Sequence, residues 1–141
     1  MAAVGLRRAR VPSGRLLLDT HALLWWLAGD RRLPESAQRI IGDETNDIYV
    51  SAASAWEIAT KLRLGKLHDP EGISVALRRH VAAQGFLELP ITLEHAREAG
   101  MLPGPHRDPF DRMLVAQARL EELALVSNEE PFDRYGISRV W

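Results

Sequence analysis

Short apolar runs alternate with longer amphipathic segments along most of this chain. Runs such as Leu16 to Leu18 and Leu123 to Val126 are too short for helices and consist wholly of apolar residues, which is typical of buried strands. Pro90 ends another run, because proline cannot donate a hydrogen bond to a neighbouring strand. We expect strands at residues 16–18, 48–50, 86–89, 123–126 and 137–141.

The segments between these runs carry the residues that begin and end helices. Gly29 stands where a helix would end in the left-handed conformation, and Thr92 is a typical N-cap. Pro34 and Pro109 fit first helical positions, and Asp108 caps the second of these helices. We therefore expect helices at residues 20–28, 34–44, 51–64, 74–84, 92–99 and 109–122.

The alternation of strands and helices predicts the fold class. Strands joined through helices pair in parallel, so we expect an α/β protein, a three-layer sandwich with a central parallel sheet of four to five strands flanked by helices. With 141 residues, of which 46% are hydrophobic, the chain is long enough for one domain with a sizeable core. We assign residues 15–141 to that domain and residues 1–14 to a flexible N-terminal extension.

The amino-acid composition limits which partners and which cellular compartment we expect. A net charge of -1 excludes a strongly basic nucleic-acid footprint, so a polyanion would have to be held by local patches and metal. The absence of cysteine excludes disulfides and thiolate catalysis. Arg7, Arg8 and Arg10 look like the start of a signal peptide, but Asp19 and His21 interrupt the apolar stretch that follows. We therefore expect no membrane span and a cytoplasmic protein.

Acidic residues follow the predicted strands or open the helices between them. Asp19 follows the first strand, Glu129 follows the fourth, and Glu57 lies in the apolar helix after the second. Asp108 and Asp111 open the helix that leads into the fourth strand. Because sites in open α/β sheets form at the carboxyl ends of the strands, all five can reach one edge. Buried carboxylates are costly alone, and a shared divalent cation would explain several at once, as in a metal-dependent hydrolase.

Each acid also has an ordinary structural explanation, which the sequence leaves open. Asp19 and Asp108 could simply cap helices, and Asp111 lies in a first turn, where the helix dipole favours an acid. Glu57 could pair with the lysine four residues later on a solvated helix face, and Glu129 could be a solvated loop residue. The apolar neighbours of Glu57 and Asp111 favour a functional role for those two.

Four stretches carry these acids in a specific order. They are LLLDTHAL at residues 16–23, VSAASAWEI at 50–58, HRDPFDR at 106–112 and LVSNE at 125–129. Together they resemble the PIN-domain family, and specifically the VapC-type ribonuclease toxins of type II toxin–antitoxin systems, over residues 15–141. At the last stretch the family usually has Thr-x-Asp, where this chain has Ser127-Asn128-Glu129.

The resemblance implies a divalent-metal-dependent endoribonuclease with an acidic pocket that binds Mg²⁺ or Mn²⁺. Asp19, Glu57 and Asp111 match the three metal-binding acids of the family, and Asp108 is an additional catalytic candidate of this subtype. Glu129 matches a fourth acid, although its side chain is one methylene longer than the usual aspartate. The resemblance also implies RNA as the substrate, a homodimer, and a cognate antitoxin whose tail enters the acidic groove.

An acidic pocket repels the phosphate backbone, so cations should line its rim. The candidate RNA contacts are Lys61, Arg63, Lys66, Arg107 and Arg112. The alternative function is a non-catalytic α/β binding module that captures a basic peptide in the acidic groove. A receiver domain is a further rival, but it would need paired acids after the first strand and a late lysine, and no lysine follows Lys66.

Overall fold

One five-stranded parallel sheet forms the centre of the molecule. The computed structural model describes residues 14–104 and 106–141, so residues 1–13 of the predicted extension lie outside the described part. The strands are β1 (Arg15–Leu18), β2 (Asp47–Ser51), β3 (Leu87–Leu89), β4 (Ala124–Val126) and β5 (Arg139–Val140). Their order in the sheet is β3-β2-β1-β4-β5, and every pair is parallel. The predicted parallel α/β sheet is confirmed.

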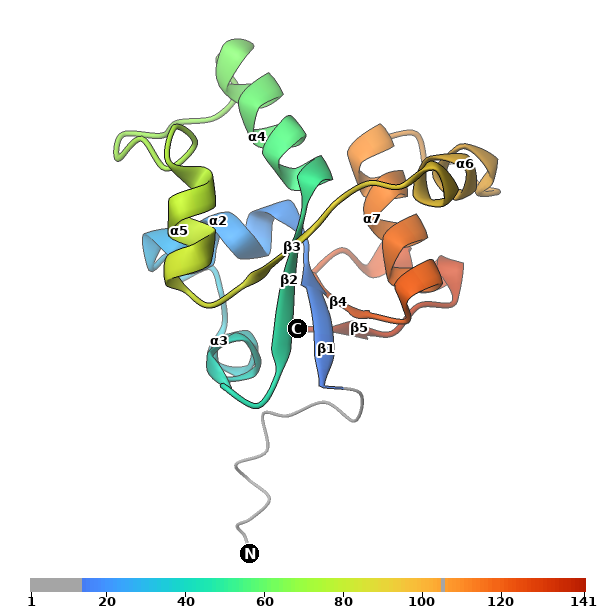
Figure 1. Ribbon diagram of the computed structural model, residues 1–141, viewed down its shortest axis with the longest axis horizontal. Coiled ribbons are helices and arrows are strands. Elements are labelled where there is room, and N and C mark those ends of the chain that lie inside the picture. Colours follow the sequence, from blue (N-terminus) through green and yellow to red (C-terminus); the bar gives the residue numbers. More distant parts are fainter. Residues whose placement is uncertain (1–13, 105) are drawn as a thin grey trace, which may run out of the picture.

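Helices cover both faces of this sheet. They are α2 (Thr20–Ala28), α3 (Glu35–Gly42), α4 (Ala52–Arg63), α5 (Leu77–Ala83), α6 (Leu93–Met101), α7 (Pro109–Glu121) and a short 3-10 helix, η1 (Glu130–Tyr135). Figure 1 shows α2, α3 and α5 on one side of the strands and α6 and α7 on the other, which gives three layers. Within the described residues, no helix is long and apolar enough to cross a membrane.

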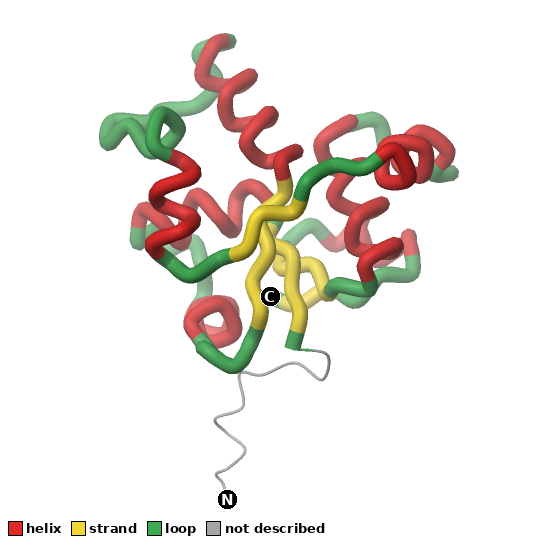
Figure 2. The backbone as a smooth tube through the Cα atoms, in the orientation of Figure 1, coloured by secondary structure: helices red, strands yellow, loops and turns green. Residues whose placement is uncertain are grey.

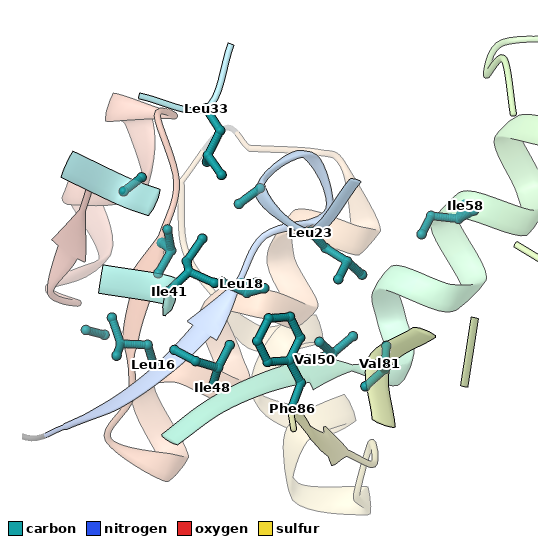
Figure 3. Close-up of a cluster of buried hydrophobic side chains, with 14 residues drawn as sticks. Leu16, Leu18, Leu23, Leu33, Ile41, Ile48, Val50, Ile58, Val81 and Phe86 are labelled. Carbon is teal, nitrogen blue, oxygen red and sulfur yellow. The ribbon is translucent and has the colours of Figure 1, made fainter. Parts of the chain in front are cut away.

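The pleat of the central strand explains why two hydrophobic cores form. Leu16 and Leu18 point to one face and Leu17 to the other, and all three are fully buried. The first core adds Leu23 of α2 and Ile41 of α3 (Figure 3), and the second core is filled largely by α7. Three consecutive apolar residues, Leu16 to Leu18, are what a strand covered on both faces requires.

Three predicted helices differ from the observed ones in where they begin or end. The helix expected from residue 74 begins at Leu77, because the Asp69 carboxylate accepts hydrogen bonds from the N–H groups of Ile73 and Ser74 and holds that segment in a turn. The helix expected to end before Gly100 continues to Met101. The 3-10 helix η1 was not predicted, and the helix expected at residues 34–44 spans only Glu35–Gly42.

Candidate functional site

The carboxyl edge of the sheet contains a topological switch point. The chain runs from β1 to β2 and β3 on one side and then crosses to β4 and β5 on the other. In open α/β sheets, ligands bind where the strand order reverses in this way. Asp19 directly follows β1 at this point, and α4 continues from β2 without an intervening loop (Figure 2). The sequence therefore folds so that a carboxylate stands at the usual position of a site.

Asp19 is buried, with 4% of its surface exposed, and caps α2. Its side chain accepts a hydrogen bond from the backbone N–H of Ala22 at 2.7 Å, and its own N–H donates to the carbonyl of Val126 at 3.1 Å. Burial raises the pKa of this carboxyl, against hydrogen bonds from Ser127 and Ala22, and the charge of Glu129 raises it further. Asp19 is thus a helix cap and also a poorly compensated buried acid.

Glu57 is 3% exposed, and both of its carboxylate oxygens have partners. The hydroxyl of Thr20 donates to Oε1 at 2.6 Å, and Nζ of Lys61 donates to Oε2 at 2.5 Å. Thr20 also shares a hydrogen bond of 3.0 Å with the hydroxyl of Ser54. The pair with Lys61 does form, but Glu57 itself is buried and does not lie on a solvated face. Because Thr20 follows Asp19 in the chain, it joins the first acid to Glu57.

The first turn of α7 brings two more acids to this edge. Oδ1 of Asp108 accepts hydrogen bonds from the N–H groups of Phe110 and Asp111, as a helix cap does. Oδ2 of Asp111 lies 2.9 Å from Nε2 of His106. Burial raises the pKa of Asp111 to about 6; the hydrogen bond with His106 opposes the rise, and the charges of Asp108 and Glu57 add to it. Asp111 therefore lies in the field of two other candidate acids.

Glu129 reaches the same edge from the other side of β1. Its charge acts on Asp19, and its backbone N–H donates to the hydroxyl of Ser127 at 3.0 Å. Ser127 is fully buried and is itself hydrogen-bonded to Asp19. The sequence places Ser127 where the family usually has the threonine of Thr-x-Asp, but it did not predict a site role for this residue. Its position directly after β4 was the signal that could have revealed it.

Carboxylate oxygens are suitable ligands for a hard divalent cation, but in this structure the acidic side chains do not surround an ion position. Mg²⁺ and Mn²⁺ prefer carboxylate oxygens. The raised pKa values of Asp19 and Asp111 show that negative charge at this edge is incompletely compensated. Within residues 14–104 and 106–141, however, no three Asp, Glu or His side chains are grouped closely enough to hold a metal ion. The predicted ligands Asp19, Glu57 and Asp111 are each held by protein groups instead.

Arg112, one of the predicted RNA contacts, is hydrogen-bonded to the backbone between α6 and α7, and its contact with RNA stays a prediction. Its guanidinium donates to the backbone carbonyls of Ala99 at 3.0 Å, Leu102 at 2.6 Å and His106 at 2.8 Å. These bonds satisfy carbonyls at the end of α6, which explains why that helix continues past Gly100. Arg112 therefore fixes the connection between α6 and α7, and with it the position of the first turn of α7.

A buried polar network supports this edge, and the sequence analysis missed it. The hydroxyl of Ser51 donates to Oε1 of Gln117 at 2.5 Å, and the amide of Gln117 donates to the carbonyl of Pro90 at 3.3 Å. The same amide lies 3.3 Å from Nδ1 of His95, whose Nε2 lies 2.8 Å from Glu121. The network ties α7 to the end of β2 and to α6. Its members are too far apart in sequence for any spacing rule to reveal them.

An exposed aromatic pair lies beside the acids. Trp56 directly precedes Glu57 and is 55% exposed, and its ring meets that of Phe110 edge-on at a centroid distance of 4.7 Å. Phe110 in turn precedes Asp111. The pair therefore joins α4 to α7, the two helices that carry Glu57 and Asp111.

The fold and the site define a class of α/β protein with an acidic switch point at the carboxyl edge of a parallel sheet. The chain belongs to the PIN-domain family, whose model matches residues 16–137. A curated relative, Ribonuclease VapC16 of Mycobacterium tuberculosis, is 42% identical over 60 residues, which is 43% of this chain and 41% of that protein. The chain thus spans less than half the length of this relative in the match. At the level of the family, the resemblance seen in the sequence is confirmed.

Solved structures share the fold over most of the chain. The structure of VapBC2 from Rickettsia felis bound to a DNA fragment from their promoter gives a TM-score of 0.64 at 16% identity, covering 89% of this chain and 97% of that one. FitAcB from Neisseria gonorrhoeae gives 0.61 at 18% identity, with 89% and 96% covered. A toxin–antitoxin complex from Klebsiella pneumoniae gives 0.57 at 19% identity, with the same coverage. At these identities the likeness establishes the fold alone.

Proposed function

We propose that this protein is a divalent-metal-dependent endoribonuclease that acts as the toxin of a toxin–antitoxin pair. The observation that carries the proposal is that acids from separate chain segments act on one another by charge, Glu129 on Asp19 and both Asp108 and Glu57 on Asp111, with the pKa values of Asp19 and Asp111 raised. The PIN-domain match and the partial identity to Ribonuclease VapC16 favour RNA as the substrate. The VapC-type assignment and the cytoplasmic location are part of the same proposal.

We assign separate roles in phosphodiester cleavage to the acids of this chain. Asp19 and Asp111 are the proposed first ligands of Mg²⁺ or Mn²⁺, with Glu57 as a third ligand or as the group that orients the attacking water. The bound cation supplies charge neutralisation at the scissile phosphate and lowers the pKa of a water. Asp108 adds negative charge beside Asp111, and Glu129 acts on Asp19 through its charge and through Ser127.

The RNA backbone needs cations where it approaches these acids. Arg63, Lys66 and Arg107 are exposed and remain the proposed backbone contacts. Trp56 offers an exposed aromatic ring next to Glu57, a kind of surface on which bases stack. The approach is therefore proposed along the outer end of α4 and the start of α7.

Cleavage by single-site variants tests the nuclease proposal. Asp19→Asn and Asp111→Asn should each lower Mg²⁺-dependent cleavage of total RNA by more than about 100-fold, since loss of a ligand should exceed the 10–100-fold effects of outer-shell changes. Asp47→Asn is the matched control, because this exposed acid begins β2 at the opposite edge of the sheet. Full activity in Asp19→Asn or Asp111→Asn, with metal still required, would remove that residue from the ligand set.

We also propose a homodimer and a small antitoxin protein as partners. An acidic edge with buried carboxylates is a natural site for an arginine, which pairs with a carboxylate through two parallel hydrogen bonds. The exposed Trp56 gives an apolar segment of a partner a place to bind beside it, whereas Trp25 and Trp26 are already half buried against the first core.

Co-expression tests the partner proposal. The chain alone should stop growth, and a small protein encoded beside it should relieve the effect by direct binding. Light scattering of the purified chain should give the mass of a dimer. A harmless chain that leaves RNA intact in Mg²⁺ and Mn²⁺ would instead favour a non-catalytic module that captures a basic peptide.

A further inference from the structure

Lys61 lies where a cation would be expected at this edge. Its Nζ is 2.5 Å from Oε2 of Glu57, and its side chain is 34% exposed, compared with 4% for that of Glu57. Burial opposes the ammonium charge, yet the pKa of Lys61 is raised, because the hydrogen bond to Glu57 and the charges of Glu57, Asp108 and Asp111 outweigh burial. The ammonium group therefore stands in the combined field of three acids.

The two partners of Glu57 differ in how easily they can leave it. Thr20 is buried and is also hydrogen-bonded to Ser54, so its hydroxyl is fixed between two helices. Lys61 carries its charge on a flexible four-carbon chain and can move its ammonium group into solvent. A cation that approaches Oε2 of Glu57 therefore meets a competitor that can be displaced.

We propose that Lys61 is the internal counter-ion of the metal-free acidic edge and that a divalent cation must displace its ammonium group from Glu57 in order to bind. The inference rests on the proposed function, which takes the cation to be Mg²⁺ or Mn²⁺ at this edge. Because the i,i+4 spacing on α4 keeps the lysine beside Glu57, the competition lowers the affinity for the cation.

A charge-removing variant measures this competition directly. Lys61→Met keeps most of the aliphatic stem, so its dissociation constant for Mn²⁺, measured by titration calorimetry on the full chain, should fall by about twofold to fivefold, the equivalent of losing one partly exposed ion pair. The gain in melting temperature on adding Mn²⁺ should also exceed that of the wild type. Arg39→Met is the matched control, since it removes the cation of another i,i+4 pair, with Glu35 on α3, and its dissociation constant should stay within about twofold of the wild-type value.

Unchanged or weaker Mn²⁺ binding in folded Lys61→Met would overturn the inference. If that variant does not fold, Lys61→Arg decides, because an arginine that holds Glu57 through two hydrogen bonds should weaken Mn²⁺ binding severalfold. Equal or tighter binding in Lys61→Arg would then overturn it. A wild-type chain that binds no Mn²⁺ would contradict the proposed function itself, so the two failures are distinguishable.

Discussion

At the scale of single residues, the ionised carboxylate of Asp111 lowers the stability of the folded protein most clearly. Burial raises its pKa from 3.8 to about 6, so the folded protein favours the protonated form of this carboxyl more than the unfolded chain does. The folded state therefore loses stability as the pH rises from about 4 to about 6, and the full loss persists at higher pH. Below about pH 3 the carboxyl is mostly protonated whether or not the chain is folded, and the cost nearly vanishes.

Asp111→Asn should remove this cost. In buffer containing a chelator at pH 7.5, we expect the free energy of unfolding to increase by about 1–2 kcal/mol, a value reduced from the full shift because the side chain is partly exposed. At pH 3 the stabilities of the variant and the wild type should nearly converge. Denaturant titrations at both pH values measure the difference. A variant less stable than the wild type at pH 7.5 would show that the hydrogen bond with His106 outweighs the burial of the charge.

Glu129 differs from the other acids in acting through a neighbour. It bonds Ser127 through its backbone and reaches Asp19 by charge alone. Glu129→Gln should therefore lower Mg²⁺-dependent cleavage by about 10-fold to 100-fold, less than Asp19→Asn does. Initial rates on one RNA substrate compare the two variants. A loss as large as that of Asp19→Asn would mean that Glu129 binds the metal directly.

At the scale of elements, the connection between α6 and α7 decides where Asp108 and Asp111 stand. Arg112 closes it through charge-assisted hydrogen bonds to four backbone carbonyls. Arg112→Met should lower the free energy of unfolding by about 2–3 kcal/mol and increase amide exchange between residues 99 and 108. Arg97→Met, which changes an exposed arginine on α6, should have little effect. Unchanged exchange in that segment would argue against the role of Arg112.

Elements that depend on local signals were predictable from the sequence. The cap residues Asp19 and Gly29 fix α2, and the three consecutive apolar residues of β1 indicate a strand covered on both faces. The late start of α5 was not predictable, because it depends on how the side chain of Asp69 folds back onto the following loop. The length of α6 was not predictable either, because it depends on Arg112, which lies on another helix.

The same distinction applies to the candidate site. The acids could be identified because charged residues beside apolar runs are conspicuous, and strand alternation predicts that they share an edge. What holds them could not be identified. Thr20, Ser127 and Gln117 are ordinary polar residues, and each has a partner far away in the sequence: Glu57, Asp19 and Ser51 respectively. Their roles emerge only once the chain is folded.

On the scale of the whole molecule, the proposed site belongs to no single layer. Asp19 comes from the central strand, Glu57 from a helix that extends beyond the sheet, and Asp111 from the helix that fills the second core (Figure 1). The site therefore exists only when both cores are packed. A cation that bridges these elements should stabilise the whole domain, since it binds the folded chain and not the unfolded one.

The location of Mn²⁺ in crystals of the wild-type chain tests the central claim most directly. We predict an anomalous scattering peak at the carboxyl edge, with carboxylate oxygens of Asp19 and Asp111 about 2.1 Å from the ion and Nζ of Lys61 withdrawn from Glu57. The same crystals should show no such peak for Asp19→Asn. A peak elsewhere on the molecule, or none at this edge in a chain that cleaves RNA, would contradict the assignment of these acids as the metal site.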